Sequence, residues 1–135
     1  MNILIIDGQG GGIGKQLVTT VKSAIPQAAV TAVGTNSAAT AVMLKAGADN
    51  AATGENAVIV GCRKADVIAG PIGIVIADSL LGEITPPMAA AIGRSGAKKV
   101  LIPVNLCDNI IVGVPDLSVG KLIQNAVEKI KSLYA

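Results

Sequence analysis

A single stretch near the N-terminus decides the fold: Ile3-Leu4-Ile5-Ile6-Asp7-Gly8-Gln9-Gly10-Gly11-Gly12-Ile13-Gly14-Lys15. Its apolar start predicts a short buried strand, its glycines predict a tight turn, and the residues from Ile13 to Ala24 predict an amphipathic helix. A strand, a glycine turn and a helix in this order present backbone N–H groups and a helix N-terminus to an anion, most often a nucleotide phosphate. The stretch therefore predicts a class of ligand, and it predicts no reaction.

The remainder of the chain alternates in the same way between apolar runs and helical patterns. Strands are predicted at 29–33, 66–69 and 99–102, with a further short edge strand at Ile110–Val112. Helices are predicted at 38–46 after Ser37 as cap, at 53–63 with Thr53 as cap, at 86–94 after Thr85, and at 119–133. Residues 58–60 also suit a strand, and the stretch 72–81 fits either a strand or a helix. This order predicts an α/β fold, namely a single Rossmann-like domain over residues 1–135 with a mainly parallel sheet of about five strands and helices on both faces.

The composition excludes several classes of function. Hydrophobic residues make up 51% of the chain and charged residues only 15%, which is typical of a folded domain that buries both faces of its sheet. Histidine is absent and Tyr134 is the sole aromatic residue. Catalysis by histidine, most zinc sites and base stacking with nucleic acid are therefore not expected. Cys62 and Cys107 match no metal-ligand spacing, so no metal is expected.

The apolar segments are too short for a membrane protein. The longest runs from Val67 to Ala77 between two aspartates, well below the roughly 20 residues that a transmembrane helix needs. The first apolar run meets the acidic Asp7 almost at once, unlike a secretory signal peptide. We therefore expect a cytoplasmic protein that makes no membrane contact.

Three phosphate-binding patterns compete for the glycine turn. The dinucleotide pattern G-x-G-x-x-G fails, because Ile13 stands where its last glycine would be. The P-loop pattern is a near miss, since Gln9 replaces its first glycine and Gln16 replaces its magnesium-binding Ser or Thr. The variant G-x-x-x-G-x-G fits and resembles the glycine motif of short-chain dehydrogenases, although their Tyr-x-x-x-Lys pair is missing here. We expect a nucleotide-binding loop, with a turn that binds nothing as the alternative; its residues are Gly8, Gln9, Gly10, Gly11, Gly12, Ile13, Gly14 and Lys15.

Other strand ends should lie beside this loop, because parallel strands place their carboxyl ends at one edge of the sheet. The second strand is followed by Thr35, Asn36 and Ser37, and by no carboxylate of the kind that holds the ribose of NAD. The hydroxyl and amide groups of these residues favour a 2′-phosphate, so NADP is weakly preferred over NAD. Two further strand ends complete the expected cofactor-binding residues with Gly70, Pro71 and Asn105.

No catalytic residue can be assigned from spacing. Glu83 could act as a general base if it were buried beside a ligand. Cys107, beside Asp108, could act as a nucleophile, but no basic residue stands near it in the sequence. Helix caps and loop contacts explain Glu55, Glu83 and Asp108 at least as well.

Several motifs along the chain together resemble one bacterial family. They are the glycine stretch 7–15, Gly34-Thr35-Asn36, Met43–Ala48, Ala52–Asn56, Gly70-Pro71-Ile72 and Leu81–Pro86. They extend over nearly the whole chain and resemble DUF3842, a bacterial family of unknown function. The resemblance implies a stand-alone bacterial protein of this size, and it implies no activity.

Three functions remain open on the sequence. The first is the binding of a phosphorylated nucleotide or dinucleotide, NADP(H) before others, in a small oxidoreductase. Its substrate pocket would then form at a homodimer interface, for which the apolar stretch Ile72–Leu81 is the candidate. The second is a non-catalytic nucleotide sensor, and the third is a structural protein whose glycine turn stays empty.

Overall fold

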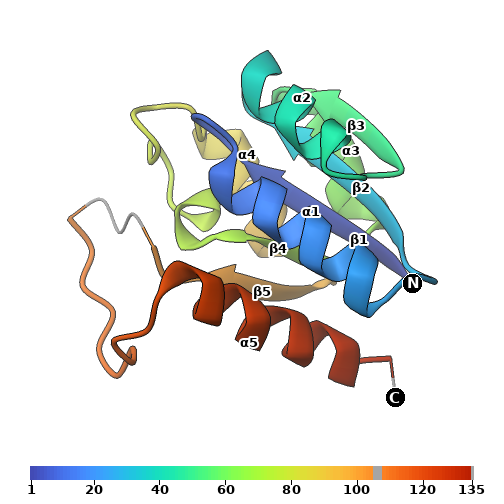
Figure 1. Ribbon diagram of the computed structural model, residues 1–135. Coiled ribbons are helices and arrows are strands. Elements are labelled where there is room, and N and C mark those ends of the chain that lie inside the picture. The colour runs from blue at the N-terminus through green and yellow to red at the C-terminus, as the bar shows by residue number, and fades with distance from the viewer. Residues whose placement is uncertain (105–107, 135) are drawn as a thin grey trace.

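Five parallel strands form one sheet in the order β3-β2-β1-β4-β5, and helices cover both of its faces (Figure 1). The computed structural model describes residues 1–104 and 108–134. Its elements are, in chain order, β1 (Asn2–Asp7), α1 (Gly12–Ala24), β2 (Ala29–Gly34), α2 (Ser37–Lys45), β3 (Asn50–Thr53), α3 (Glu55–Lys64), β4 (Val67–Pro71), the short 3-10 helix η1 (Ile72–Val75), α4 (Pro86–Arg94), β5 (Lys98–Ile102) and α5 (Val119–Ser132). The predicted Rossmann-like α/β fold is confirmed.

The apolar run of β1 is buried on both faces of the sheet. Ile3 and Ile5 belong to the core cluster that includes α1, α2 and α5, whereas Leu4 and Ile6 belong to the cluster with α3 and α4. In Figure 1, α1 and α5 lie on the near face of the sheet. Successive side chains of a strand point to opposite faces, so an uninterrupted apolar strand requires helices on both sides.

The two edges of the sheet differ from the sequence predictions. β3 forms one edge, where only a helix was predicted to begin, and its hydrogen-bonded pairing with β2 compensates for the weak strand preference of Asn-Ala-Ala-Thr. The predicted strand at Ile110–Val112 is wrong, because these residues lie in an exposed segment without helix or strand. The other edge is β5. The expected number of strands is therefore right, although one of them was assigned to the wrong residues.

The starts of three helices test the predicted caps. Asn36, and not Ser37, caps α2, because the Asn36 side chain accepts a hydrogen bond from the Ala39 N–H at 2.9 Å. Gly54, with φ of 100°, precedes α3, so Thr53 is the last residue of β3 and no cap. Thr85 caps α4 as predicted.

The segment from Ile72 to Leu81 forms η1 and a series of turns, so it is neither the strand nor the α-helix that the sequence allowed. Ile74 and Leu80 are buried against Met88 and other core residues of the same chain. These two side chains are covered by their own chain, whereas Leu81 is 95% exposed, so a dimer interface at this segment stays a prediction. No helix in the described part of the chain has the length and apolar character that a membrane crossing would require.

Candidate functional site

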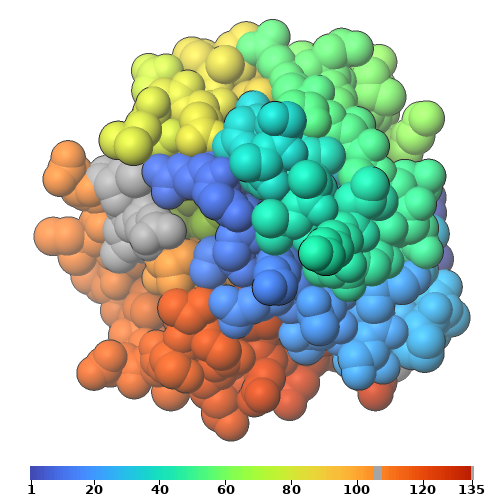
Figure 2. All heavy atoms as spheres, turned by 45° about the horizontal axis from the view of Figure 1, so that its top comes forward, coloured from blue at the N-terminus to red at the C-terminus, as the bar shows by residue number. Residues whose placement is uncertain are grey.

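The glycine loop, residues 8–12, follows the central strand β1 at the carboxyl edge of the sheet. Strands β2 and β4 flank β1 on opposite sides, so the loop lies at the switch point where open α/β sheets bind ligands. Figure 2 shows the blue surface of the loop and of α1 between the cyan start of α2 and the yellow segment that precedes α4.

Three of the glycines are required by packing within the protein. A Cβ atom at Gly8 would come within 2.5 Å of Thr35 Oγ1, and one at Gly14 within 2.9 Å of the Cβ of Asp7. Gly11 has φ of +74°, and its added Cβ would lie 2.9 Å from the Cα of Ala39. These close approaches hold β1, α1 and α2 together, so they explain the three glycines without a ligand.

Gly10 and Gly12 are different, because both are exposed and an added Cβ would meet no atom within 4 Å. Within residues 1–104 and 108–134, their N–H groups donate to no acceptor. Gly11 is the N-cap of α1 and offers no side-chain cap, and the first turn of the helix holds no acidic residue. Lys15 lies exposed one turn further on. An anion can therefore approach the start of α1 here.

Asp7 ends β1 and anchors the glycine loop from inside. Its carboxylate accepts hydrogen bonds from the Gly8 N–H at 2.8 Å and from the Gly14 N–H at 2.7 Å. Burial raises the pKa of Asp7 above its ordinary value, the N–H groups of Gly14 and Gly8 oppose this rise, and the charge of Glu83 adds to it. Both carboxylate oxygens thus hold the loop in place.

Glu83 reaches the glycine loop from the segment between η1 and α4. Its Oε1 accepts three hydrogen bonds, from Thr35 Oγ1 at 2.6 Å, from Asn36 Nδ2 at 2.7 Å and from the Gln9 N–H at 2.9 Å. Desolvation acts to raise the pKa of Glu83, but the three donors outweigh it and keep that pKa below its ordinary value. One ionised carboxylate therefore joins the segments that follow β1, β2 and β4.

The segment that carries Glu83 has an unusual backbone. Asp78, Leu80 and Leu81 have φ of 67°, 55° and 56°, in the left-handed region that residues other than glycine rarely adopt. Main-chain hydrogen bonds hold the segment, among them one from the Asp78 N–H to the Ile84 oxygen at 2.7 Å. The buried Ser79 hydroxyl also donates to the Gly73 oxygen. Strain of this kind persists only where surrounding contacts enforce it, and here it positions Glu83.

The other predicted cofactor-binding residues that the structure describes differ in exposure. Ser37 is exposed in the first turn of α2, and Gly70 and Pro71 are buried at the end of β4. A Cβ at Gly70 would collide with the main-chain oxygen of Ile6. The predicted Asn105 and Cys107 lie outside the described residues.

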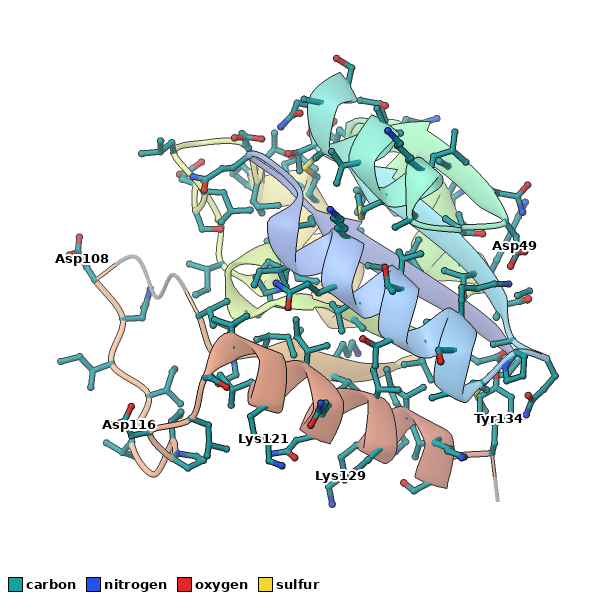
Figure 3. The ribbon with its side chains drawn as sticks, in the orientation of Figure 1. Asp49, Asp108, Asp116, Lys121, Lys129 and Tyr134 are labelled. Carbon is teal, nitrogen blue, oxygen red and sulfur yellow. The ribbon has the colours of Figure 1, made fainter. Side chains whose placement is uncertain are left out.

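Two further acidic residues singled out in the sequence lie apart from the glycine loop. Glu55 Oε1 accepts a hydrogen bond from Thr85 Oγ1 at 2.5 Å, which ties the start of α3 to the cap of α4. Asp108 is exposed between β5 and α5 (Figure 3). Among residues 1–104 and 108–134, no three His, Cys, Asp or Glu side chains gather closely enough to hold a metal ion.

Two hollows lie away from the glycine loop. One of about 380 Å³ lies between α3 and strands β1 to β3, with Leu4, Val33 and Val60 among its lining residues. The other, of about 580 Å³, lies beside β5 and α5. Neither is lined by the residues that Glu83 and Asp7 hold together.

Comparison with known proteins places the chain in a family without a known activity. It is similar to a solved dodecameric FMN-dependent UbiX-like decarboxylase from Escherichia coli O157:H7, with 14% sequence identity over 99% of this chain and 94% of that chain. The TM-score is 0.48, a likeness too weak to bear on the site. No curated protein matches the sequence. The model of the family described as Domain of unknown function (DUF3842) matches residues 2–135, so this chain belongs to that family, as its motifs predicted.

Proposed function

We propose that the glycine loop binds the phosphate groups of a nucleotide at the N-terminus of α1. The observation that carries this proposal is the division among the glycines, since Gly8 and Gly14 serve internal packing and Gly12 has open space around it. In dinucleotide-binding loops the first glycine permits the turn, the second lets the backbone approach the pyrophosphate, and the third permits close packing of helix on strand. The Asp7 carboxylate takes the Gly14 N–H from inside, whereas in the described part of the chain the N–H of Gly12 stays open to the outside, and the exposed Lys15 adds a positive charge for phosphate.

Gly12→Val is the sharpest test of this proposal. The new side chain would begin in space free of protein atoms, so the free energy of unfolding should stay within about 1 kcal/mol of wild type. The same side chain fills the space through which a phosphate approaches. We expect nucleotide affinity to fall at least about 30-fold, equivalent to the loss of a charge-assisted hydrogen bond. Isothermal titration calorimetry with NAD, NADP, FAD, ATP and GTP measures the effect.

Gly120→Val is the matched control. Gly120 is also exposed near the start of a helix, α5, and an added Cβ there also meets no atom within 4 Å. Gly120→Val should leave nucleotide affinity unchanged. Its free energy of unfolding should change only by the difference in helix preference between glycine and valine. Wild-type protein that binds none of the five nucleotides would reject the proposal and leave the loop as a structural turn. Undiminished binding by Gly12→Val would put the nucleotide elsewhere.

For the ribose, we propose contact with Glu83. The preference for NADP rests on the missing carboxylate after β2, but Glu83 lies within 2.6 Å of Thr35 Oγ1 at that strand end. A carboxylate accepts hydrogen bonds from ribose hydroxyls, and its charge repels a 2′-phosphate. We therefore propose a nucleotide with free ribose hydroxyls, with NAD in place of NADP.

Glu83→Gln should shift the choice between the two dinucleotides. The amide keeps an acceptor oxygen for the loop but loses the negative charge, so the ratio of NAD affinity to NADP affinity should fall at least about 10-fold. Titration of both cofactors into both proteins measures this ratio. Glu128→Gln removes an exposed carboxylate on α5 and should leave the ratio unchanged. Wild-type protein that prefers NADP would exclude Glu83 as the ribose acceptor.

The use of the two carboxylates favours a nucleotide sensor over an oxidoreductase as the second part of this proposal. Asp7 is buried and both of its oxygens accept hydrogen bonds from the loop, and Glu83 is assigned here to the ribose, so neither carboxylate is left as a general base toward a substrate. A sensor should bind NAD and reduce none of it in the presence of a panel of alcohols and hydroxy acids. Reduction of NAD that depends on a substrate would contradict the sensor and support an oxidoreductase.

A further inference from the structure

Residues 108–118, here called the arm, extend from the body of the molecule between β5 and α5 (Figures 1 and 3). Every residue of the arm is exposed, and none lies in a helix or strand. Ile110 and Val112 are 89% and 90% exposed, although the run Ile110–Val112 consists of the residue types most favourable to a strand. A contiguous exposed apolar segment of this kind marks an interaction surface.

A surface that suits the arm lies along β5. This strand forms the edge of the sheet and pairs with β4, so within the described residues one row of its main-chain N–H and C=O groups has no partner strand. The hollow of about 580 Å³ follows this edge, and the half-buried Val100, Leu101 and Leu122 line it. An apolar groove beside a free strand edge can accept one further strand, which gains main-chain hydrogen bonds and seats alternate side chains.

The arm and the helix beside this groove differ in charge. The arm contains Asp108 and Asp116 and no basic residue. The charged residues that line the groove are Lys129 and Glu128, but α5 as a whole is basic, because it carries Lys121, Lys129 and Lys131 against the single acidic Glu128. Figure 3 shows Asp108 and Asp116 on the arm, away from Lys129. Neither aspartate forms an ion pair within the described residues.

The arm does not lie along β5 of its own chain. Residues 108–118 are all exposed and none of them lies in a strand, so in the described part of the chain β5 pairs with β4 alone. The arm of a second copy can approach this open edge from outside the molecule.

We propose that two copies of this chain exchange arms, so that residues 110–114 of each copy add a strand to the β5 edge of the other and fill the β5–α5 groove. The exchange gives the strand-forming run Ile110–Val112 the partner that a single chain lacks. It also brings the acidic arm to the basic helix α5 in a closed, symmetric contact. The expected dimer then uses the arm in place of Ile72–Leu81.

The double variant Ile110→Lys, Val112→Lys tests the exchange. Both side chains are exposed within one chain, so the fold should be retained, as circular dichroism can verify. The lysines remove two apolar contacts and place positive charge beside the basic helix α5. Size-exclusion chromatography with light scattering should show a dimer for wild type in the micromolar range. The double variant should raise the dimer Kd at least about 100-fold.

Leu81→Lys is the control, because Leu81 is 95% exposed on a different segment and should leave the dimer unchanged. Hydrogen exchange gives a second measurement, in which protection of the β5 amides should rise with concentration in wild type and not in the double variant. A monomeric wild type throughout the micromolar range would overturn the proposal. So would a dimer that tolerates both lysines, or β5 protection that is independent of concentration.

Discussion

Gly70→Ala is expected to lower the free energy of unfolding by about 3 kcal/mol. The added methyl group would collide with the main-chain oxygen of Ile6 and lie 3.0 Å from Cδ1 of Ile74. A side chain could rotate away, but the Ile6 oxygen belongs to the central strand, so β1 and β4 must separate at the switch point. Asp7 follows Ile6 directly, and nucleotide binding should weaken with stability. Denaturant unfolding followed by circular dichroism measures the loss.

Gly93→Ala is the control for an added methyl group on a glycine. Gly93 is exposed in α4, and a Cβ there meets no atom within 4 Å. Alanine favours a helix over glycine, so this variant should gain about 0.5–1 kcal/mol. A Gly70→Ala protein as stable as wild type would show that the two strands do not need this close approach.

Glu83→Ala is expected to cost about 2 kcal/mol at neutral pH, the second of the large effects. It removes the common acceptor of the Thr35 hydroxyl, the Asn36 amide and the Gln9 N–H. Glu83 is half-buried, so water replaces part of what is lost. Glu55→Ala is the matched control, since Glu55 accepts one side-chain hydrogen bond, from Thr85, and should cost about 1 kcal/mol or less. An equal loss of unfolding free energy in the two variants would show that Glu83 does not stabilise the contact between these three segments.

Glu83 also makes the free energy of unfolding depend on pH. Its effect has the opposite direction to that of Asp7. The pKa of Glu83 lies below the ordinary 4.5, so its contribution is complete above that pH and is lost as the pH falls through its folded value. The pKa of Asp7 lies above the ordinary 3.8, so its contribution is present at low pH and is lost as the pH rises through its folded value. Wild type should therefore lose stability below pH 4.5 more steeply than Glu83→Gln. Parallel stability profiles for the two proteins would contradict this assignment.

Local patterns predicted the centre of the fold and failed at its edges. The run from Ile3 to Ile6 is apolar at every position, and only a strand covered on both faces can bury it. An edge strand depends less on its own residues, as β3 shows by pairing with β2 despite its weak strand preference. Ile110–Val112 shows the converse, because a strong strand preference meets no strand within the same chain.

The sequence predicted the glycine loop, but it did not predict which side chains surround that loop. Which glycines stay open depends on neighbours from α2 and β2, such as Ala39 and Thr35, whose positions only the fold defines. Glu83 lies 74 residues from Gln9 along the chain. Its segment adopts left-handed backbone at Leu80 and Leu81, which no residue preference indicates. The sequence analysis found no carboxylate after β2. The structure places one there, Glu83, which comes from the segment that follows β4.

We expect the contacts of Glu83 to form late in the folding of the protein. They join residues 47, 48 and 74 positions apart, and loops of this length close more slowly than local helices and turns form. Strands β1 and β2 with helices α1 and α2 are complete by Lys45, whereas Glu83 arrives only after β4 has crossed to the other side of β1. A chain emerging from the ribosome therefore carries its glycine loop long before it carries the carboxylate that closes it.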